Sequence, residues 1–212
     1  MTADRLLLWR HGRTASNAGD RFQGQLDVPL DDVGRVQIKD AAELLASLIA
    51  GTPTRIASSD LTRAHETARA LAAVTGLPIS LDPRLREIDV KRWQDLRRIE
   101  VEAREPEAFA AWRAGEDIPV GGGERRSEAG ARAAEAILEH ARVMDGGILV
   151  IASHGAALRG AVMRLIGLSS WSPHLLGGMR NAHWAELARR GETWVLDGYN
   201  VGPLRGSVGP EG

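Results

Sequence analysis

Short apolar runs alternate with amphipathic segments along most of the chain. Residues 5–10 and 147–152 each carry a continuous apolar stretch, which is typical of a parallel strand buried on both faces. Residues 33–49 and 61–75 instead place apolar side chains three and four positions apart, the spacing of an amphipathic helix. Strands that alternate with helices predict an α/β fold, with a mostly parallel central sheet covered by helices on both faces.

The rest of the chain continues this alternation. We predict further strands at 55–58, 79–81, 183–188 and 193–199, and further helices at 127–142 and 156–167. Residues 92–122 are polar and contain tryptophan, with two expected helices at 95–104 and 106–114, and we interpret them as a small helical lid. A single domain is therefore expected over residues 1–205, followed by a flexible tail at 206–212 that is rich in Gly and Pro.

Two histidines stand in the same setting, directly after an apolar run and directly before a glycine. They are His11 and His154. In an open α/β sheet, ligands bind just beyond the carboxyl ends of parallel strands, so both imidazoles are expected to face one crevice. Each histidine alone could equally be a turn residue with backbone partners, but that interpretation is weaker for the pair.

The charge balance and the absence of cysteine narrow the function classes. The chain has 27 basic and 28 acidic residues, which gives no reason to expect a nucleic-acid or membrane partner, so an anion site must be built locally. The lack of cysteine excludes disulfides, thiolate metal sites and cysteine nucleophiles. No apolar run approaches the ~18 residues of a membrane span; we expect neither a span nor a signal peptide, and a cytoplasmic protein.

Phosphoryl transfer is the chemistry that these strand ends suit. A neutral imidazole can attack phosphorus when its other ring nitrogen is held by a hydrogen bond. Arginine forks neutralise phosphate; Arg10 adjoins His11, and Arg63 follows the second strand near the start of a helix, whose amides also favour anions. Glu87, after the third strand, could protonate the leaving alkoxide. Nothing in this set requires a metal ion or a cofactor.

Four motifs, in order along the chain, carry a family resemblance. They are Arg10-His11-Gly12 with Thr14, Asn17 and Gln23-Gly24; residues 58–68; residues 85–88; and Ser153-His154-Gly155. Together they resemble the histidine phosphatase (phosphoglycerate mutase-like) superfamily across residues 5–165. The resemblance implies a phosphoglycerate mutase-like fold and a metal-independent phosphomonoesterase that works through a phosphorylated His11.

The same resemblance implies the roles of the other site residues. It places Arg10, Arg63 and His154 in the phosphate pocket, and it makes Glu87 the acid and base. The residues that it implies on the substrate side are Thr14, Asn17, Gln23, Gly24 and Gly155.

Two stretches, residues 22–27 and 176–184, are more specifically similar to actinobacterial glucosyl-3-phosphoglycerate phosphatases, which implies a phosphorylated glycerate or sugar as the substrate. The chain departs from the family pattern at Lys91 and Asp95, where members usually carry glycine, and at Arg125, where serine is usual. If the first two positions require positive φ, the loop after Glu87 should adopt another shape here. Arg125 could add an anion contact, although a solvated charge is the more ordinary interpretation.

Three other functions stay open: a broad-specificity phosphatase, a cofactor-dependent phosphoglycerate mutase, and a catalytically inactive relative that binds phospho-ligands. The mutases usually have a longer insertion than residues 88–122, and the intact set of catalytic residues argues against an inactive relative. A metal site lacks a third ligand at the usual spacing. The expected partner is a small phosphorylated metabolite, and the family resemblance and the apolar C-terminal segment favour a homodimer.

Arginines and tryptophans outside the motifs offer further contacts. Arg13 and Arg21 follow the first histidine and could bind a carboxylate or a second phosphate, although solvent exposure explains them equally well. Four tryptophans could wall a sugar site, although large aromatic residues more often pack in a core or a lid. They are Trp93, Trp112, Trp171 and Trp184.

Overall fold

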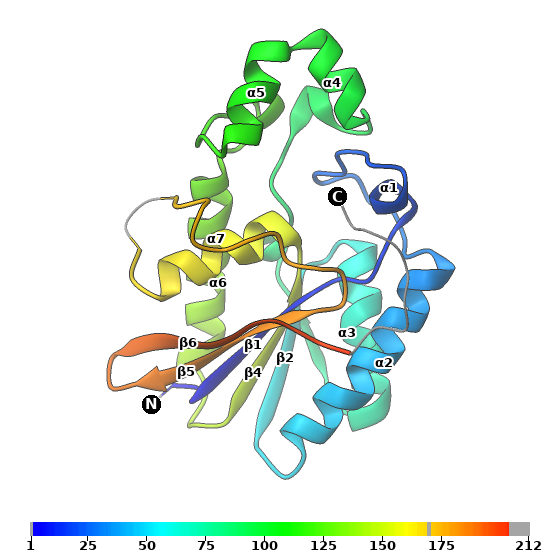
Figure 1. Ribbon diagram of the computed structural model, residues 1–212. Coiled ribbons are helices and arrows are strands. Elements are labelled where there is room, and N and C mark those ends of the chain that lie inside the picture. The colour runs from blue at the N-terminus through cyan, green and yellow to red at the C-terminus, as the bar shows by residue number, and fades with distance from the viewer. Residues whose placement is uncertain (1, 169–170, 204–212) are drawn as a thin grey trace.

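A six-stranded sheet forms the centre of the computed structural model, which describes residues 2–168 and 171–203 (Figure 1). The strands lie in the order β3-β2-β4-β1-β5-β6. Their bounds are β1 (Arg5–Arg10), β2 (Thr54–Ser58), β3 (Ile79–Leu81), β4 (Ile148–Ser153), β5 (Trp184–Arg190) and β6 (Thr193–Val201). The first four strands in this order are parallel, whereas β5 is antiparallel to both β1 and β6. The predicted mostly parallel sheet is confirmed.

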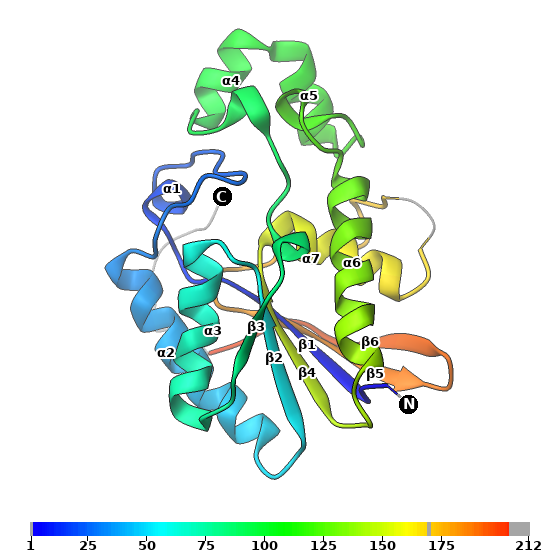
Figure 2. The same ribbon diagram turned by 180° about the vertical axis from the view of Figure 1, so that it is seen from behind.

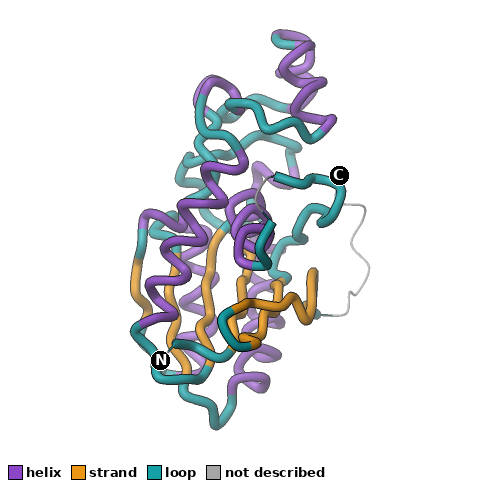
Figure 3. The backbone as a smooth tube through the Cα atoms, turned by 90° about the vertical axis from the view of Figure 1, so that its left-hand side faces the viewer, coloured by secondary structure: helices purple, strands orange, loops and turns teal. Residues whose placement is uncertain are grey.

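Helices cover both faces of this sheet, so the molecule has three layers (Figures 2 and 3). In β1, Leu6 and Leu8 join the core beside α6 (Arg126–Arg142) and α7 (Gly155–Leu165), whereas Leu7 and Trp9 join the core beside α2 (Asp32–Ile49) and α3 (Thr62–Thr75). Successive side chains of a strand point to opposite faces, so the continuous apolar run reflects burial on both sides. The α-helices are α1 (Ala15–Ala18), α2 (Asp32–Ile49), α3 (Thr62–Thr75), α4 (Arg98–Arg104), α5 (Pro106–Ala114), α6 (Arg126–Arg142) and α7 (Gly155–Leu165).

Local sequence signals set the ends of α2 and α3. Asp31 caps α2, and its Oδ1 accepts a hydrogen bond from the backbone N–H of Gly34 at 2.7 Å. The last turn of α3 is followed by Gly76, whose φ of 73° is a left-handed conformation that glycine adopts without strain. Both helices lie within one residue of their predicted bounds, because capping and periodicity are local properties of the sequence.

Two glycines let α6 and α7 pack closely together. A Cβ atom on Gly130 of α6 would lie 2.6 Å from backbone atoms of Gly160 in α7, which is closer than any real Cβ contact. The helices therefore touch through their backbones at this point. This contact matters for function because the first turns of both helices lie at the site described below.

The segment between β3 and α6 leaves the sheet and forms the predicted helical lid over the carboxyl ends of the strands (Figure 1). Its small core is built around Trp93, which is fully buried, with Val101 and Phe109 beside it. The helix expected at 95–104 begins only at Arg98. Besides α4 and α5, this segment contains the 3₁₀ helices η1 (Pro83–Leu85), η2 (Lys91–Trp93) and η3 (Val120–Gly122).

Lys91 and Asp95 adopt φ values of 38° and 63°, the left-handed region that favours glycine. The expectation that side chains at these positions would force the loop into another shape is therefore wrong. Side-chain contacts hold this backbone: Lys91 Nζ lies 2.7 Å from Asp89 Oδ2, and Arg21 donates to the carbonyl oxygen of Asp95 at 2.5 Å. Such residues cost about 1–3 kcal/mol each and persist where their surroundings over-determine the backbone.

β5 and β6 form the C-terminal hairpin and extend beyond their predicted ends, to Arg190 and Val201. The tail predicted to be flexible, at 206–212, lies outside the described residues. Within the described ranges, no helix is long and apolar enough to cross a membrane.

Candidate active site

The two His-Gly motifs meet at the carboxyl ends of neighbouring strands. β1 and β4 are paired in register, with Arg10 opposite Ser153, and the N–H of His11 donates to the carbonyl oxygen of Ser153 at 3.0 Å. The imidazole rings of His11 and His154 lie with their centroids 5.2 Å apart. The structure thus brings together two residues that are 143 positions apart in the sequence.

His11 is held in the orientation that a nucleophile needs. Its Nδ1 lies 2.7 Å from the carbonyl oxygen of Gly12, so Nδ1–H donates and the lone pair remains on Nε2. The side chain of Asn181 donates from Nδ2 to the carbonyl oxygens of His11 and Gly12 at 3.0 and 3.2 Å, which fixes the backbone around the ring. Burial, followed by the charges of Arg63 and Arg10, holds the pKa of His11 well below its usual value. The ring is therefore neutral at neutral pH.

Arg63 supplies a buried positive charge next to these rings. Its guanidinium donates to the carbonyl oxygens of Gly24 and Leu26 at 2.8 and 2.7 Å, and its Nε donates to Nδ1 of His154 at 3.2 Å. All three acceptors are neutral, and the described part of the chain contains no carboxylate within ion-pair distance of Arg63. Burial lowers its pKa to about 10, so the charge persists at neutral pH and is available to an anion.

His154 lies behind His11 rather than at the surface of the cavity. Since its Nδ1 accepts from Arg63, its Nε2 carries the proton and donates to Oγ of Ser59 at 2.9 Å. Burial, and then the charge of Arg63, lowers its pKa well below the usual value. In this arrangement, His154 fixes Arg63 and packs against His11.

The low pKa values of His11 and His154 give a prediction for stability. Below the ordinary histidine value of 6.5, the unfolded chain binds protons that the folded protein excludes, so the folded state loses stability as pH falls. Each histidine contributes up to about 1.4 kcal/mol per pH unit below that point. Urea denaturation between pH 7 and pH 5 should show this decline, and His11→Asn should reduce its slope. His174→Asn, which removes an exposed histidine, serves as the control. An unchanged slope in His11→Asn would contradict the assignment.

Glu87 is anchored at the first turn of α7. Its Oε1 accepts from the backbone N–H of Ile88 at 2.9 Å and of Ala157 at 3.0 Å, and its Oε2 accepts from the N–H of Ala156 at 3.2 Å. Arg132 supports the same segment: it donates to the carbonyl oxygens of Arg84, Arg86 and Glu87. Arg132 itself is held by an ion pair with Glu124. The carboxyl group is therefore held at a defined place beside the cavity.

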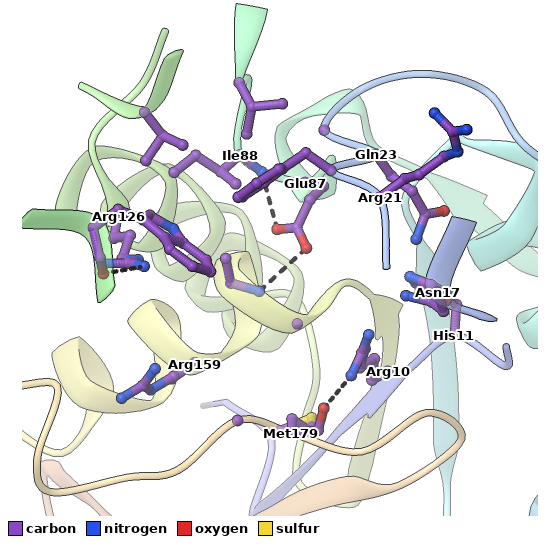
Figure 4. A pocket seen from close by; sticks show the side chains of 18 of the residues that line it. Arg10, His11, Asn17, Arg21, Gln23, Glu87, Ile88, Arg126, Arg159 and Met179 are labelled. Carbon is purple, nitrogen blue, oxygen red and sulfur yellow. Dashed lines mark hydrogen bonds between the residues drawn. The ribbon is translucent and has the colours of Figure 1, made fainter. Parts of the chain in front are cut away.

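His11, Arg63 and Glu87 line a cavity of about 310 Å³ (Figure 4). Among the lining residues that the structure describes, Glu87 is the sole carboxylate. At one edge of the cavity, Arg10 donates to the carbonyl oxygen of Met179. Six arginines line the cavity: Arg10, Arg21, Arg63, Arg98, Arg126 and Arg159. The cavity thus attracts anions. Within the described ranges, no three His, Cys, Asp or Glu residues gather in a group that could hold a metal ion.

The structure places the other predicted substrate residues around this cavity, with one exception. Asn17, Gln23, Gly24 and Gly155 line it. Thr14 is one step removed: it caps α1, and its hydroxyl donates to Oε1 of Gln23 at 2.8 Å. Since Oδ1 of Asn17 accepts from Thr14 and from Asn181, the group that Asn17 offers to a ligand is Nδ2.

Some arginines and tryptophans were interpreted in the sequence either as ligand contacts or as ordinary core or surface residues. The structure places some of them at the cavity and the others elsewhere in the fold. Trp112, Trp171 and Arg21 line the cavity. Trp93 and Trp184 instead pack in the lid and sheet cores. Arg13 pairs with Asp31 at 2.8 Å and lies outside the cavity lining, and Arg125 is exposed on the outer surface.

Four residues that the structure places at the site were missed as site residues in the sequence. They are Arg98, Arg126, Arg159 and Asn181. The arginines had no signal, because this chain carries many arginines and none of these three belongs to a recognised motif. Asn181 lies in the stretch 176–184 that carried the narrower resemblance, and this could have identified it.

Comparison with known proteins shows the family to which this fold and site belong. The family model of the histidine phosphatase superfamily (branch 1) matches residues 6–202, and the chain belongs to this superfamily. It is 40% identical over 195 residues to glucosyl-3-phosphoglycerate phosphatase of Mycolicibacterium vanbaalenii, covering 89% of this chain and 85% of that protein. It is 32% identical over 208 residues to the metal-independent phosphoserine phosphatase of Arabidopsis thaliana, covering 96% and 84%.

A solved structure has the same fold. Mycobacterial glucosyl-3-phosphoglycerate phosphatase complexed with VO3 superposes with a TM-score of 0.87 at 37% identity, covering 93% of this chain and 99% of that one. The predicted phosphoglycerate mutase-like α/β architecture is therefore confirmed, as is the predicted superfamily.

Proposed function

We propose that this protein is a metal-independent phosphomonoesterase that transfers the phosphoryl group of its substrate to His11 and then to water. The observation that carries this proposal is the state of His11: a buried, neutral imidazole whose Nδ1 is bonded to Gly12, with Arg10 and Arg63 beside it in a cationic cavity. Such a ring has its Nε2 lone pair ready for attack, and the arginines stabilise the charge on the phosphoryl oxygens.

The reaction has two steps. In the first, Nε2 of His11 forms a bond to phosphorus while the bond between phosphorus and the ester oxygen breaks, and Glu87 gives its proton to the departing alkoxide. In the second, water attacks the phosphorus of phospho-His11 and loses a proton to Glu87. The N–P bond breaks, phosphate leaves, and both residues return to their starting states. The anchorage of Glu87 on α7 keeps one carboxyl group in reach of both oxygens.

We propose glucosyl-3-phosphoglycerate as the substrate. Two features support this assignment: the 40% identity to an enzyme of that name, and a cavity lined by Trp112 and Trp171 as well as arginines. An indole face suits a hexose ring, and the cationic groups suit a phosphate and a carboxylate. The cytoplasmic location, the homodimer and the lack of nucleic-acid and membrane partners stay predictions.

The substrate assignment predicts a preference among phosphate esters. Contacts to the glucosyl group that are used in the transition state should raise kcat/KM for glucosyl-3-phosphoglycerate at least ~10-fold above that for 3-phosphoglycerate, about 1.4 kcal/mol. Phosphate release from a panel of sugar phosphates and phosphoglycerates measures this. A flat profile would instead indicate a broad-specificity phosphatase, and interconversion of 2- and 3-phosphoglycerate faster than phosphate release would indicate a mutase.

Metal independence predicts a second pattern. Arginine and histidine side chains supply the charge stabilisation here, so EDTA should leave kcat unchanged within about twofold. Orthovanadate should inhibit competitively, because it adopts the five-coordinate geometry of the phosphoryl group in flight. Phosphate release from p-nitrophenyl phosphate measures both effects. Activity that is lost in EDTA and restored by a divalent ion would refute this mechanism.

A further inference from the structure

Four arginines line the cavity in addition to Arg10 and Arg63, and they fall into two classes. Arg98 and Arg21 are paired with acids: Arg98 Nε lies 3.1 Å from Asp20, and Arg21 lies 3.8 Å from Asp95. Arg126 and Arg159 have no carboxylate within 4.0 Å among the described residues. In the outer part of the cavity, these two guanidinium groups are therefore the ones without a direct ion pair, and Asp117 acts on Arg126 only from beyond that distance.

Arg126 is the first residue of α6 and is 9% exposed. Its terminal nitrogens donate to the carbonyl oxygens of Glu116 and Trp112, and its guanidinium lies 5.2 Å from the ring centroid of Trp112 and 5.5 Å from that of Trp171. Burial, followed by the charge of Arg159, lowers its pKa to about 10. The side chain is thus charged at neutral pH, and two carbonyl oxygens and two indole rings hold it in place.

Arg159 lies on α7, just after the first turn that holds Glu87. Like Arg126, it lines the cavity. Its guanidinium lies 4.8 Å from the ring centroid of Trp171, and one terminal nitrogen donates to the carbonyl oxygen of Pro173. Its Nε is buried and has no hydrogen-bond partner among the described residues. A buried guanidinium N–H without a partner is costly, and two like charges at one place increase that cost, unless an anion binds there.

We propose that Arg126 and Arg159 form a second anion subsite that binds the carboxylate of a phosphorylated hydroxy acid. The Nε–H of Arg159 together with a terminal N–H forms a fork that matches the two oxygens of a carboxylate. In Figure 4, Arg126 and Arg159 lie on the side of the cavity away from Asn17 and Arg21. The inference rests on the proposed function, and it replaces Arg13 and Arg21 with Arg126 and Arg159 as the carboxylate contacts.

The subsite explains how a phosphatase with one general phosphate pocket can select acidic esters. The phosphate lies against His11, Arg10 and Arg63, while the carboxylate at the far end of the same small molecule neutralises the outer pair. An ester without the carboxylate leaves both guanidinium groups without a counter-ion and leaves the buried Nε–H of Arg159 without an acceptor. Discrimination therefore arises from these unsatisfied groups as much as from the new contacts.

A pair of substrates tests this directly. 3-Phosphoglycerate and glycerol 3-phosphate differ only in the replacement of the carboxylate by a hydroxymethyl group. The wild-type enzyme should prefer 3-phosphoglycerate at least ~10-fold in kcat/KM, and Arg159→Met should reduce that preference to below about threefold. Arg126→Met should act in the same direction. The control is Arg98→Met, which removes an arginine of the same cavity that already has an acid partner and should keep the preference.

Two results would overturn the subsite. One is a wild-type enzyme without any preference between the two esters. The other is an equal fall in kcat/KM for both esters in Arg159→Met. Arg159 would then support the structure of the lid or attract anions in general, without recognising the carboxylate. Calorimetric binding of the same two compounds to His11→Ala protein measures carboxylate recognition without turnover and without an arginine substitution. A lost catalytic function and a wrong subsite are therefore distinguished.

Discussion

Replacing His11 by alanine should lower kcat for p-nitrophenyl phosphate at least ~10⁴-fold, because the variant lacks the atom to which the phosphoryl group is transferred. The fold should persist, since the backbone bonds of this segment to Ser153 and Asn181 do not involve the imidazole. Initial rates of nitrophenol release measure the loss, and circular dichroism measures the fold.

The covalent intermediate itself can be trapped. Brief incubation with ³²P-labelled substrate, followed by rapid quenching, should leave acid-labile radioactivity on His11, and the peptide that contains residues 5–13 should carry it. His174→Ala, which removes an exposed histidine, should retain both turnover and labelling. Full activity in His11→Ala, or a label on another residue, would exclude the proposed nucleophile.

The strand ends were the most predictable part of the molecule. A run of four buried apolar residues in β1 requires helices on both faces, and that arrangement places the following residue at the edge where ligands bind. The sequence therefore indicated that His11 and His154 share a crevice, although it could not supply the pairing of β1 with β4. That pairing depends on long-range packing.

The supporting contacts were not predictable. Arg63 is held by the carbonyl oxygens of Gly24 and Leu26, about forty positions away, and a backbone carbonyl leaves no mark in the sequence. Arg126 and Arg159 come from separate helices, α6 and α7, which pack closely through Gly130 and Gly160, and both line the same cavity. In a chain rich in arginine, residue type alone does not identify those at the site.

The positive φ values of Lys91 and Asp95 illustrate a second limit. Lysine and aspartate rarely adopt a left-handed backbone, yet side-chain contacts hold both residues in that conformation here. The loop in question connects Glu87 to the lid. Hydrophobic periodicity predicts the long helices α2, α3 and α6 to within one residue, because it is a local property of the sequence. It predicts this loop poorly because distant partners determine the loop's backbone.

Glu87→Gln should reduce kcat 10²–10⁴-fold for esters with an alkoxide leaving group, because an amide cannot deliver the proton that such a group needs. p-Nitrophenyl phosphate has a stable leaving group, so its kcat should fall at least ~10-fold less. The comparison of two substrates in one variant matters, since glutamine also alters the contacts with the backbone N–H groups of Ala156 and Ala157. A lost anchor, or a lost base in the second step, would affect both substrates equally, whereas a lost proton donor slows the first step for the alkyl ester alone.

Steady-state kinetics with glycerol 3-phosphate and p-nitrophenyl phosphate measure this difference. Glu135→Gln, at an exposed position of α6, makes the same chemical change outside the cavity and should leave both rates unchanged. Equal losses for the two substrates in Glu87→Gln would make Glu87 a positioning residue. The proton would then have to come from elsewhere, and because Glu87 is the sole carboxylate among the described lining residues, water would be the remaining donor.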